Sequence, residues 1–171
     1  MPGSGKSTVA DMLKARGFTM VEHSAQIKRL MQIGGMEINA KTIETFVVKL
    51  KEAFGRDVVA KLSSKMISNA EGDVVISGPR DPAEVDYIRT IRPGVVVVAV
   101  SAPSEMRYER LLDRKEGIQT SSHREFEWRD KKNIALGTMD LINAADYSLQ
   151  NAGTIDQLGA RVDEMLNKLR G

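Results

Sequence analysis

A glycine-rich motif at the start of the chain constrains the fold more than any other feature. The chain opens MPGSGKST, which supplies seven of the eight positions of the phosphate-loop pattern GxxxxGK[ST]. In this pattern backbone N–H groups wrap nucleotide phosphates, the lysine reaches the β- and γ-phosphates, and the next hydroxyl holds Mg²⁺. We therefore expect ATP, with Mg²⁺ on Ser7, and phosphate contacts from Gly3, Ser4, Gly5, Lys6, Ser7 and Thr8.

The start of this pattern lies outside the sequence. Its first glycine, and the apolar strand that normally leads into such a loop, would both precede Met1. We expect that strand in the middle of a parallel sheet, between the strands that end near Arg80 and Ser101. The sequence as given is therefore expected to be truncated or to have a misassigned start.

Composition limits the possible functions. A length of 171 residues with 42% hydrophobic content predicts a single domain over residues 1–171. Lysine and arginine number 25 against 23 acidic residues, so no nucleic-acid or membrane surface is expected. The chain has no cysteine, which excludes disulfides and thiolate metal sites. Because we find neither a long apolar run nor a signal peptide pattern, we expect a cytoplasmic monomer or homodimer.

Helical and extended patterns alternate along the chain, which predicts an α/β fold with a parallel sheet. Two predicted helices between the first two strands suggest an inserted substrate-binding lobe. The predicted helices cover about 6–16, 39–54, 82–92, 103–114 and 122–133, and the predicted strands about 19–22, 73–76, 95–100 and 147–149. A further helix is predicted from about Val58, and Thr154 with Gln157 predicts the capped start of a final amphipathic helix.

Polar residues follow the predicted strands, where the ligands of parallel α/β sheets gather. Arg80 comes after a strand and a glycine, so we expect it to bind a phosphate or carboxylate. The turn from Asn151 to Gly153 follows the last strand. Asp81 and Pro82 predict the start of a helix, and we expect Glu84 to serve as a cap of that helix.

A group of arginines after the third predicted strand forms another candidate site. Arg107, Arg110 and Arg114 recur at spacings of three and four, which places them on one helix face. The alternative is a solvated surface on which the interleaved acidic residues pair with them. A polar segment and the helix bearing Arg124 and Arg129 follow, which together predict a lid that closes over phosphates.

These motifs together resemble the P-loop nucleoside monophosphate kinases. The strings GSGKST, VVISGPR and ADYSLQNAGT and the arginine-bearing helix carry the resemblance, which is closest to the archaeal adenylate-kinase-related proteins, with dephospho-CoA kinase nearby. It implies a three-layer P-loop kinase fold with a helical acceptor-binding insertion over about 24–70 and a lid over about 107–132. Two positions depart from the family. Ser77 stands where these kinases have an aspartate. Many relatives have a second aspartate just after the second strand, where this chain has Glu22, His23 and Ser24.

The resemblance also implies roles for individual residues. Arg80 would hold the acceptor phosphate, and Arg110 and Arg114 would bridge donor and acceptor phosphates, with Arg107, Arg124 and Arg129 as further candidates. Asn151 and Gly153 would border the adenine, mostly through backbone atoms.

The predicted function is ATP-dependent phosphoryl transfer to a nucleotide-like small molecule, such as a nucleoside monophosphate. One alternative is a dephospho-CoA kinase, which needs a base for a ribose hydroxyl and has only Glu22 or His23 as local candidates. Another is a switch that binds ATP and hydrolyses it slowly. A third is an inert truncated form.

Overall fold

The computed structural model of the chain describes all residues except 114–119 and 121. The strands are β1 (Thr19–Glu22), β2 (Val74–Ser77), β3 (Val98–Ser101) and β4 (Tyr147–Gln150). The helices of the described residues are α1 (Lys6–Ala15), α2 (His23–Ile33), α3 (Ala40–Phe54), α4 (Val58–Asn69), α5 (Pro82–Ile91), α6 (Ser104–Leu112), α7 (His123–Ala135), α8 (Thr138–Asn143) and α9 (Ile155–Arg170). None of these helices has the length and apolar character needed to cross a membrane.

The strands form two parallel pairs. β1 pairs with β2, from Thr19 opposite Val74 to Glu22 opposite Ser77, and β3 pairs with β4. In the described part of the chain β2 and β3 do not pair with each other, and no strand precedes α1. The expected middle strand between β2 and β3 stays a prediction.

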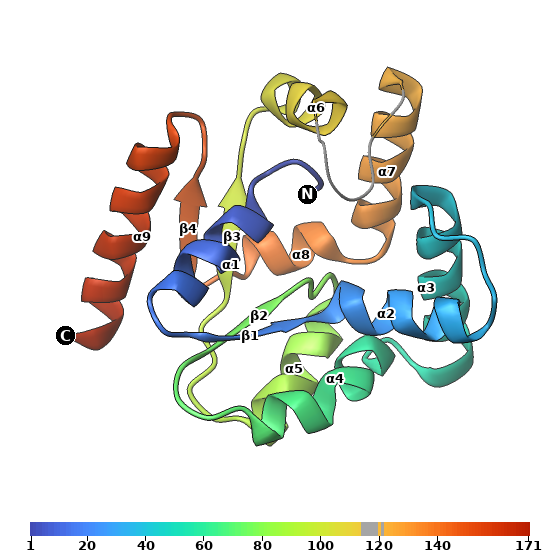
Figure 1. Cartoon of the computed structure of the whole chain (residues 1–171), viewed down its shortest axis with the longest axis horizontal. Coiled ribbons are helices and arrows are strands. Elements are labelled where there is room, and N and C mark those ends of the chain that lie inside the picture. Colours follow the sequence, from blue (N-terminus) through green and yellow to red (C-terminus); the bar gives the residue numbers. More distant parts are fainter. Residues whose placement is uncertain (114–119, 121) are drawn as a thin grey trace.

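Helices cover both faces of the strands. Side chains alternate along a strand, so neighbours point to opposite faces. In β2, Val75 packs against the apolar cluster of α1 and α9, whereas Val74 and Ile76 pack against the cluster of α4 and α5. Figure 1 shows α9 beside β4 and α1 crossing over the strands, with α4 and α5 together below them. This arrangement of helix, parallel strands and helix confirms the predicted α/β fold class.

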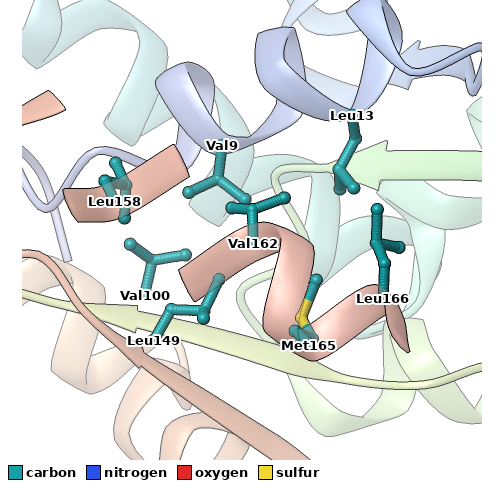
Figure 2. Packing of buried hydrophobic residues seen from close by; sticks show 8 residues of the cluster. All are labelled: Val9, Leu13, Val100, Leu149, Leu158, Val162, Met165 and Leu166. Atoms are coloured by element: carbon teal, nitrogen blue, oxygen red, sulfur yellow. The ribbon is translucent and has the colours of Figure 1, made fainter. Parts of the chain in front are cut away.

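The largest apolar cluster fixes the position of α1, and so of the loop before it. Figure 2 shows its side chains converging from α1, β3, β4 and α9. Val162 and Met165 of α9 are 0% and 1% exposed, and each fully buried side chain of this kind contributes about 1.5–3 kcal/mol. The buried members are Val9, Leu13, Val100, Leu149, Leu158, Val162, Met165 and Leu166.

A second cluster joins the helices that lie between β1 and β2. Ile27 and Met31 of α2 pack with Ile43 and Val47 of α3 and with the start of α4. Sequence analysis predicted α3 and α4 but missed α2, which begins directly after β1 without a side-chain cap. These helices form the region of the predicted acceptor-binding insertion, whose boundaries stay a prediction.

Candidate functional site

The phosphate loop leads directly into the amino terminus of α1. Gly3 and Gly5 adopt φ of 75° and 97°, in the left-handed region that favours glycine. Gly5 is the residue before α1, and the first turn of that helix contains no acidic side chain. Helix N-termini present free backbone N–H groups and partial positive charge, so this end of α1 is suited to binding a phosphate.

The polar side chains of the loop differ in accessibility. Lys6 donates a hydrogen bond from Nζ to the carbonyl oxygen of Met1 at 2.7 Å, so it lies folded across the loop. Ser7 is exposed and Thr8 is half-buried. Ser4, at 1% exposed, is enclosed by the protein. The hydroxyl that the motif assigns to Mg²⁺ is therefore open to a ligand.

The loop is packed closely against two other segments. A Cβ atom on Gly3 would lie 2.5 Å from the carbonyl oxygen of Arg107, and one on Gly5 would lie 2.1 Å from Nδ2 of Asn151. Both distances are shorter than any van der Waals contact allows. Both positions favour glycine for conformation. A Cβ on Gly3 would also meet backbone atoms, whereas one on Gly5 would displace the end of the Asn151 side chain.

Asn151 connects the loop to α6. Its Nδ2 donates to the carbonyl oxygen of Ser4 at 2.9 Å, and its own N–H donates to the carbonyl oxygen of Ser101 at 2.7 Å. Arg110 donates from Nη2 to the carbonyl oxygen of Asn151 at 3.1 Å. The side chain of Asn151 thus has a supporting contact that sequence analysis did not predict, while its place beside adenine stays a prediction.

The arginines of α6 have different environments. Arg107 is 7% exposed, pairs with Asp130 of α7 at 2.6 Å, and donates to the carbonyl oxygen of Pro2 at 3.1 Å. The solvated-surface alternative is therefore wrong for Arg107, which supports the loop from inside the protein. Nη1 of Arg110 is buried and has no hydrogen-bond partner among the described residues. Arg114 lies outside the described residues.

The other residues predicted for the site are not among those that contact the loop. They are Arg124, Arg129 and Gly153. Arg124 is exposed. Arg129 is 8% exposed and donates from Nη1 to Thr120 Oγ1 at 2.8 Å, so it packs between segments of the predicted lid region. Gly153 is exposed, and a Cβ there would lie 1.9 Å from Oε1 of Gln157, the side chain that caps α9.

The charge around the loop is positive. Burial, together with the positive charges of Lys6 and Arg107, lowers the pKa of the Met1 amino group to about 4. Burial, the largest cause, disfavours the charged form of this amino group, and the two nearby cations act in the same direction. Lys6 and Arg107 are themselves suited to the phosphates of a nucleotide.

Arg80 contacts elements other than those that hold the loop. It follows β2, and its carbonyl oxygen accepts a hydrogen bond from Thr138 at the start of α8 at 3.2 Å. Its Nη1 donates to both carboxylate oxygens of Glu44 in α3, each at 2.7 Å. Sequence analysis missed Glu44, because an acidic residue within an amphipathic helix carries no signal of a partner 36 positions away.

A buried network next to Arg80 corrects the expectation for Glu84. Glu84 is 2% exposed and pairs with Lys51 at 2.7 Å, so it does not cap α5. Nδ1 of His23, at 1% exposed, lies 3.4 Å from the other Glu84 oxygen. The cap of α5 is supplied by Asp81 alone, which accepts from the N–H of Ala83 at 3.0 Å.

The electrostatics of Asp81 result from opposing effects. Burial acts to raise its pKa, but the hydrogen bonds from Arg56 and from the Ala83 N–H and the charge of Lys51 outweigh burial and lower it below the ordinary value. Asp81 therefore holds its negative charge in the network. The network fixes α3, α5 and the segment after β2 relative to one another.

One cavity of the described residues lies apart from the loop residues. A hollow of about 220 Å³ lies between α6 and α7 and is lined by Ser104, Glu105, Tyr108, Glu109 and His123. Its volume is small for a nucleotide, and no loop residue lines it.

A phosphate loop at the start of α1, parallel strands covered by helices, and cations from α6 define a P-loop nucleotide-binding protein of the kinase-like kind. Residues 1–135 match the family model described as "AAA domain". A UPF0200 protein of Thermococcus onnurineus is 31% identical over 99% of this chain and 94% of its own length, and one of Thermococcus kodakarensis is 33% identical over 99% and 96%. The chain therefore belongs to the UPF0200 proteins and to the AAA domain family.

A solved structure supports the fold. The crystal structure of TT1252 from Thermus thermophilus superposes with a TM-score of 0.68, covers 99% of this chain and 94% of its own, and is 22% identical. At that identity the similarity concerns the fold alone.

Proposed function

We propose that this protein is an ATP-dependent kinase that transfers the γ-phosphoryl group to a nucleoside monophosphate or a similar nucleotide-like acceptor. The observation that carries the proposal is the connection of Arg110, through Asn151, to the phosphate loop that holds Lys6. Lys6 of α1 and Arg110 of α6 would then bind the same phosphates. Phosphoryl transfer depends mostly on such alignment and charge neutralisation.

The donor is ATP, held by the backbone of the loop and by Lys6. Mg²⁺ fits a site made of the exposed Ser7 hydroxyl and the nucleotide's own phosphate oxygens, because Mg²⁺ keeps several waters and needs few protein ligands. The described residues contain no group of three or more acidic or histidine side chains that would hold a metal ion by themselves. When bound, Mg²⁺ supplies neutralisation of the phosphate charge.

The acceptor is placed by Arg80. In the reaction an oxygen of the acceptor phosphate forms a bond to the γ-phosphorus while the bond from that phosphorus to the β,γ-bridging oxygen breaks, and ADP leaves. Arg110 neutralises the charge on the oxygens in transit, and Arg114, outside the described residues, is assigned the same role. No side chain acts as a covalent nucleophile.

The structure gives less support to a dephospho-CoA kinase. That reaction needs a base for a ribose hydroxyl, and His23 is buried against Glu84, out of reach of a bound ligand. Glu22 is half-buried at the end of β1 and remains the other candidate.

The test is a coupled assay of ATP with AMP, CMP and dephospho-CoA, together with calorimetric titration of each ligand. We expect transfer to a monophosphate, and Arg80→Ala should weaken the acceptor far more than ATP. Arg80→Lys should also be impaired, because lysine lacks the two-pronged geometry of arginine. Arg89→Ala, on the exposed surface of α5, is the matched control. ADP release without transfer to any acceptor would favour a hydrolytic switch instead.

A further inference from the structure

Arg80 is already paired with a carboxylate in this structure. Its Nη1 contacts both oxygens of Glu44 at 2.7 Å, which is the short distance typical of a charged hydrogen bond. Arg80 is half-buried and Glu44 is 4% exposed. An anion therefore already lies on the residue that we assign to the acceptor.

Glu44 is held in this place by the helix that carries it. Its neighbours on α3, Ile43 and Val47, are buried in the second apolar cluster. A carboxylate at this depth has lost most of its water, so it depends on a cation partner. Among the hydrogen bonds and ion pairs of the described residues, that partner is Arg80.

The other cations near Arg80 are paired as well. Lys51 lies between Asp81 at 3.2 Å and Glu84 at 2.7 Å, and Arg56 contacts Asp81 at 2.9 Å. Each of these cations contacts a carboxylate, and Asp81 is shared by both. An incoming anion that binds Nη1 of Arg80 would therefore replace the Glu44 carboxylate that is already there.

We propose that Glu44 occupies the position of the acceptor's anionic group on Arg80, and that acceptor binding exchanges this carboxylate for a phosphate. This inference rests on the proposed function and assigns Glu44 a role in specificity. Displacing Glu44 costs free energy, so it weakens the binding of every acceptor. A phosphomonoester dianion offers more charge and more acceptor oxygens than a carboxylate, so it can displace Glu44, whereas an uncharged nucleoside cannot.

The experiment compares the parent protein with Glu44→Gln and with the control Glu52→Gln, an exposed position on the same helix. AMP, adenosine, inorganic phosphate and ATP are titrated by calorimetry into each protein. Glutamine keeps the shape of the side chain but removes the competing charge. We expect Glu44→Gln to bind AMP and phosphate about tenfold more tightly or better, with adenosine and ATP unchanged. Glu52→Gln should match the parent.

A second readout uses the parent protein, in case the variant does not fold. A crystal structure with AMP should show its phosphate on Arg80 and the Glu44 carboxylate moved away. Equal or weaker AMP binding by Glu44→Gln, or an AMP complex with the Arg80 to Glu44 pair intact, would overturn the exchange. Loss of turnover in Glu44→Gln at unchanged AMP affinity would also overturn it and assign Glu44 as a base. A different result would contradict the proposed kinase function itself: a parent protein that neither binds ATP nor transfers phosphate.

Discussion

The side-chain amide of Asn151 donates a hydrogen bond to the carbonyl oxygen of Ser4 at 2.9 Å, joining positions 147 apart in sequence. Arg110 of α6 donates to the backbone of the same asparagine. The shape of the phosphate loop and the placement of a candidate phosphate-binding arginine thus depend on one turn after β4. This relationship leads to direct tests.

Asn151→Ala should loosen the loop. The substitution leaves the carbonyl oxygen of buried Ser4 without its partner, which costs about 1–3 kcal/mol. We expect a lower unfolding temperature and weaker ATP binding, measured by calorimetry. Asn143→Ala, at an exposed position of α8, is the control. An Asn151→Ala protein that unfolds and binds ATP like the parent would show that the tether is dispensable.

Gly5→Ala and Gly17→Ala form a matched pair that separates crowding from backbone strain. Both glycines adopt a positive φ, 97° and 92°, so alanine costs about 1–2 kcal/mol at either place. Only at Gly5 does the new Cβ meet a neighbour, Asn151 Nδ2 at 2.1 Å, while nothing lies within 4 Å of one at Gly17. Thermal unfolding should therefore show the larger loss for Gly5→Ala, along with loss of ATP binding. Equal losses of stability would contradict the close packing described here.

Asp81 should make stability depend on pH. Its pKa is lowered in the folded protein, so its contribution is fully present above the ordinary carboxyl pKa of about 4 and is lost as the pH falls through the folded value. The difference in unfolding free energy between the parent and Asp81→Asn should therefore be constant from pH 7 to about 5 and shrink below about 4. Asp86→Asn, exposed on α5, is the control and should leave the unfolding free energy at pH 7 close to that of the parent. A constant difference down to pH 3 would argue against a charged Asp81 in the network.

Local signals allowed much of the fold to be predicted from the sequence. Thr154 and Gln157 form the capping box that begins α9, where a helix start was predicted, and β1 occupies the predicted residues. By contrast, α2 carries no side-chain cap and starts at His23, directly after the last residue of β1, so nothing local marked it. The strand β3 begins at Val98 rather than near Val95, because hydrogen bonding to β4, not apolar content, sets its length.

The site was predictable only where a motif defines it. The loop from Gly3 to Thr8 follows a known spacing, and the structure places it at a helix start as expected. The supports of the loop come from distant segments. Pairing of Arg107 with Asp130, and of Arg80 with Glu44, depends on how α6, α7 and α3 meet. Sequence spacing carries no information on such contacts.

In the proposed reaction, Lys6 serves phosphoryl transfer from ATP. Lys6→Ala removes the charge at the β- and γ-phosphates, and one such positioned group is typically worth about 10²- to 10³-fold in rate. Lys14→Ala, an exposed lysine on the same helix, is the control. The decisive measurement is the rate of ATP-dependent transfer to AMP, with folding verified by circular dichroism. We predict a loss of about 10²-fold or more for Lys6→Ala and none for Lys14→Ala. Turnover by a folded Lys6→Ala protein at the parent rate would contradict the assignment of the site.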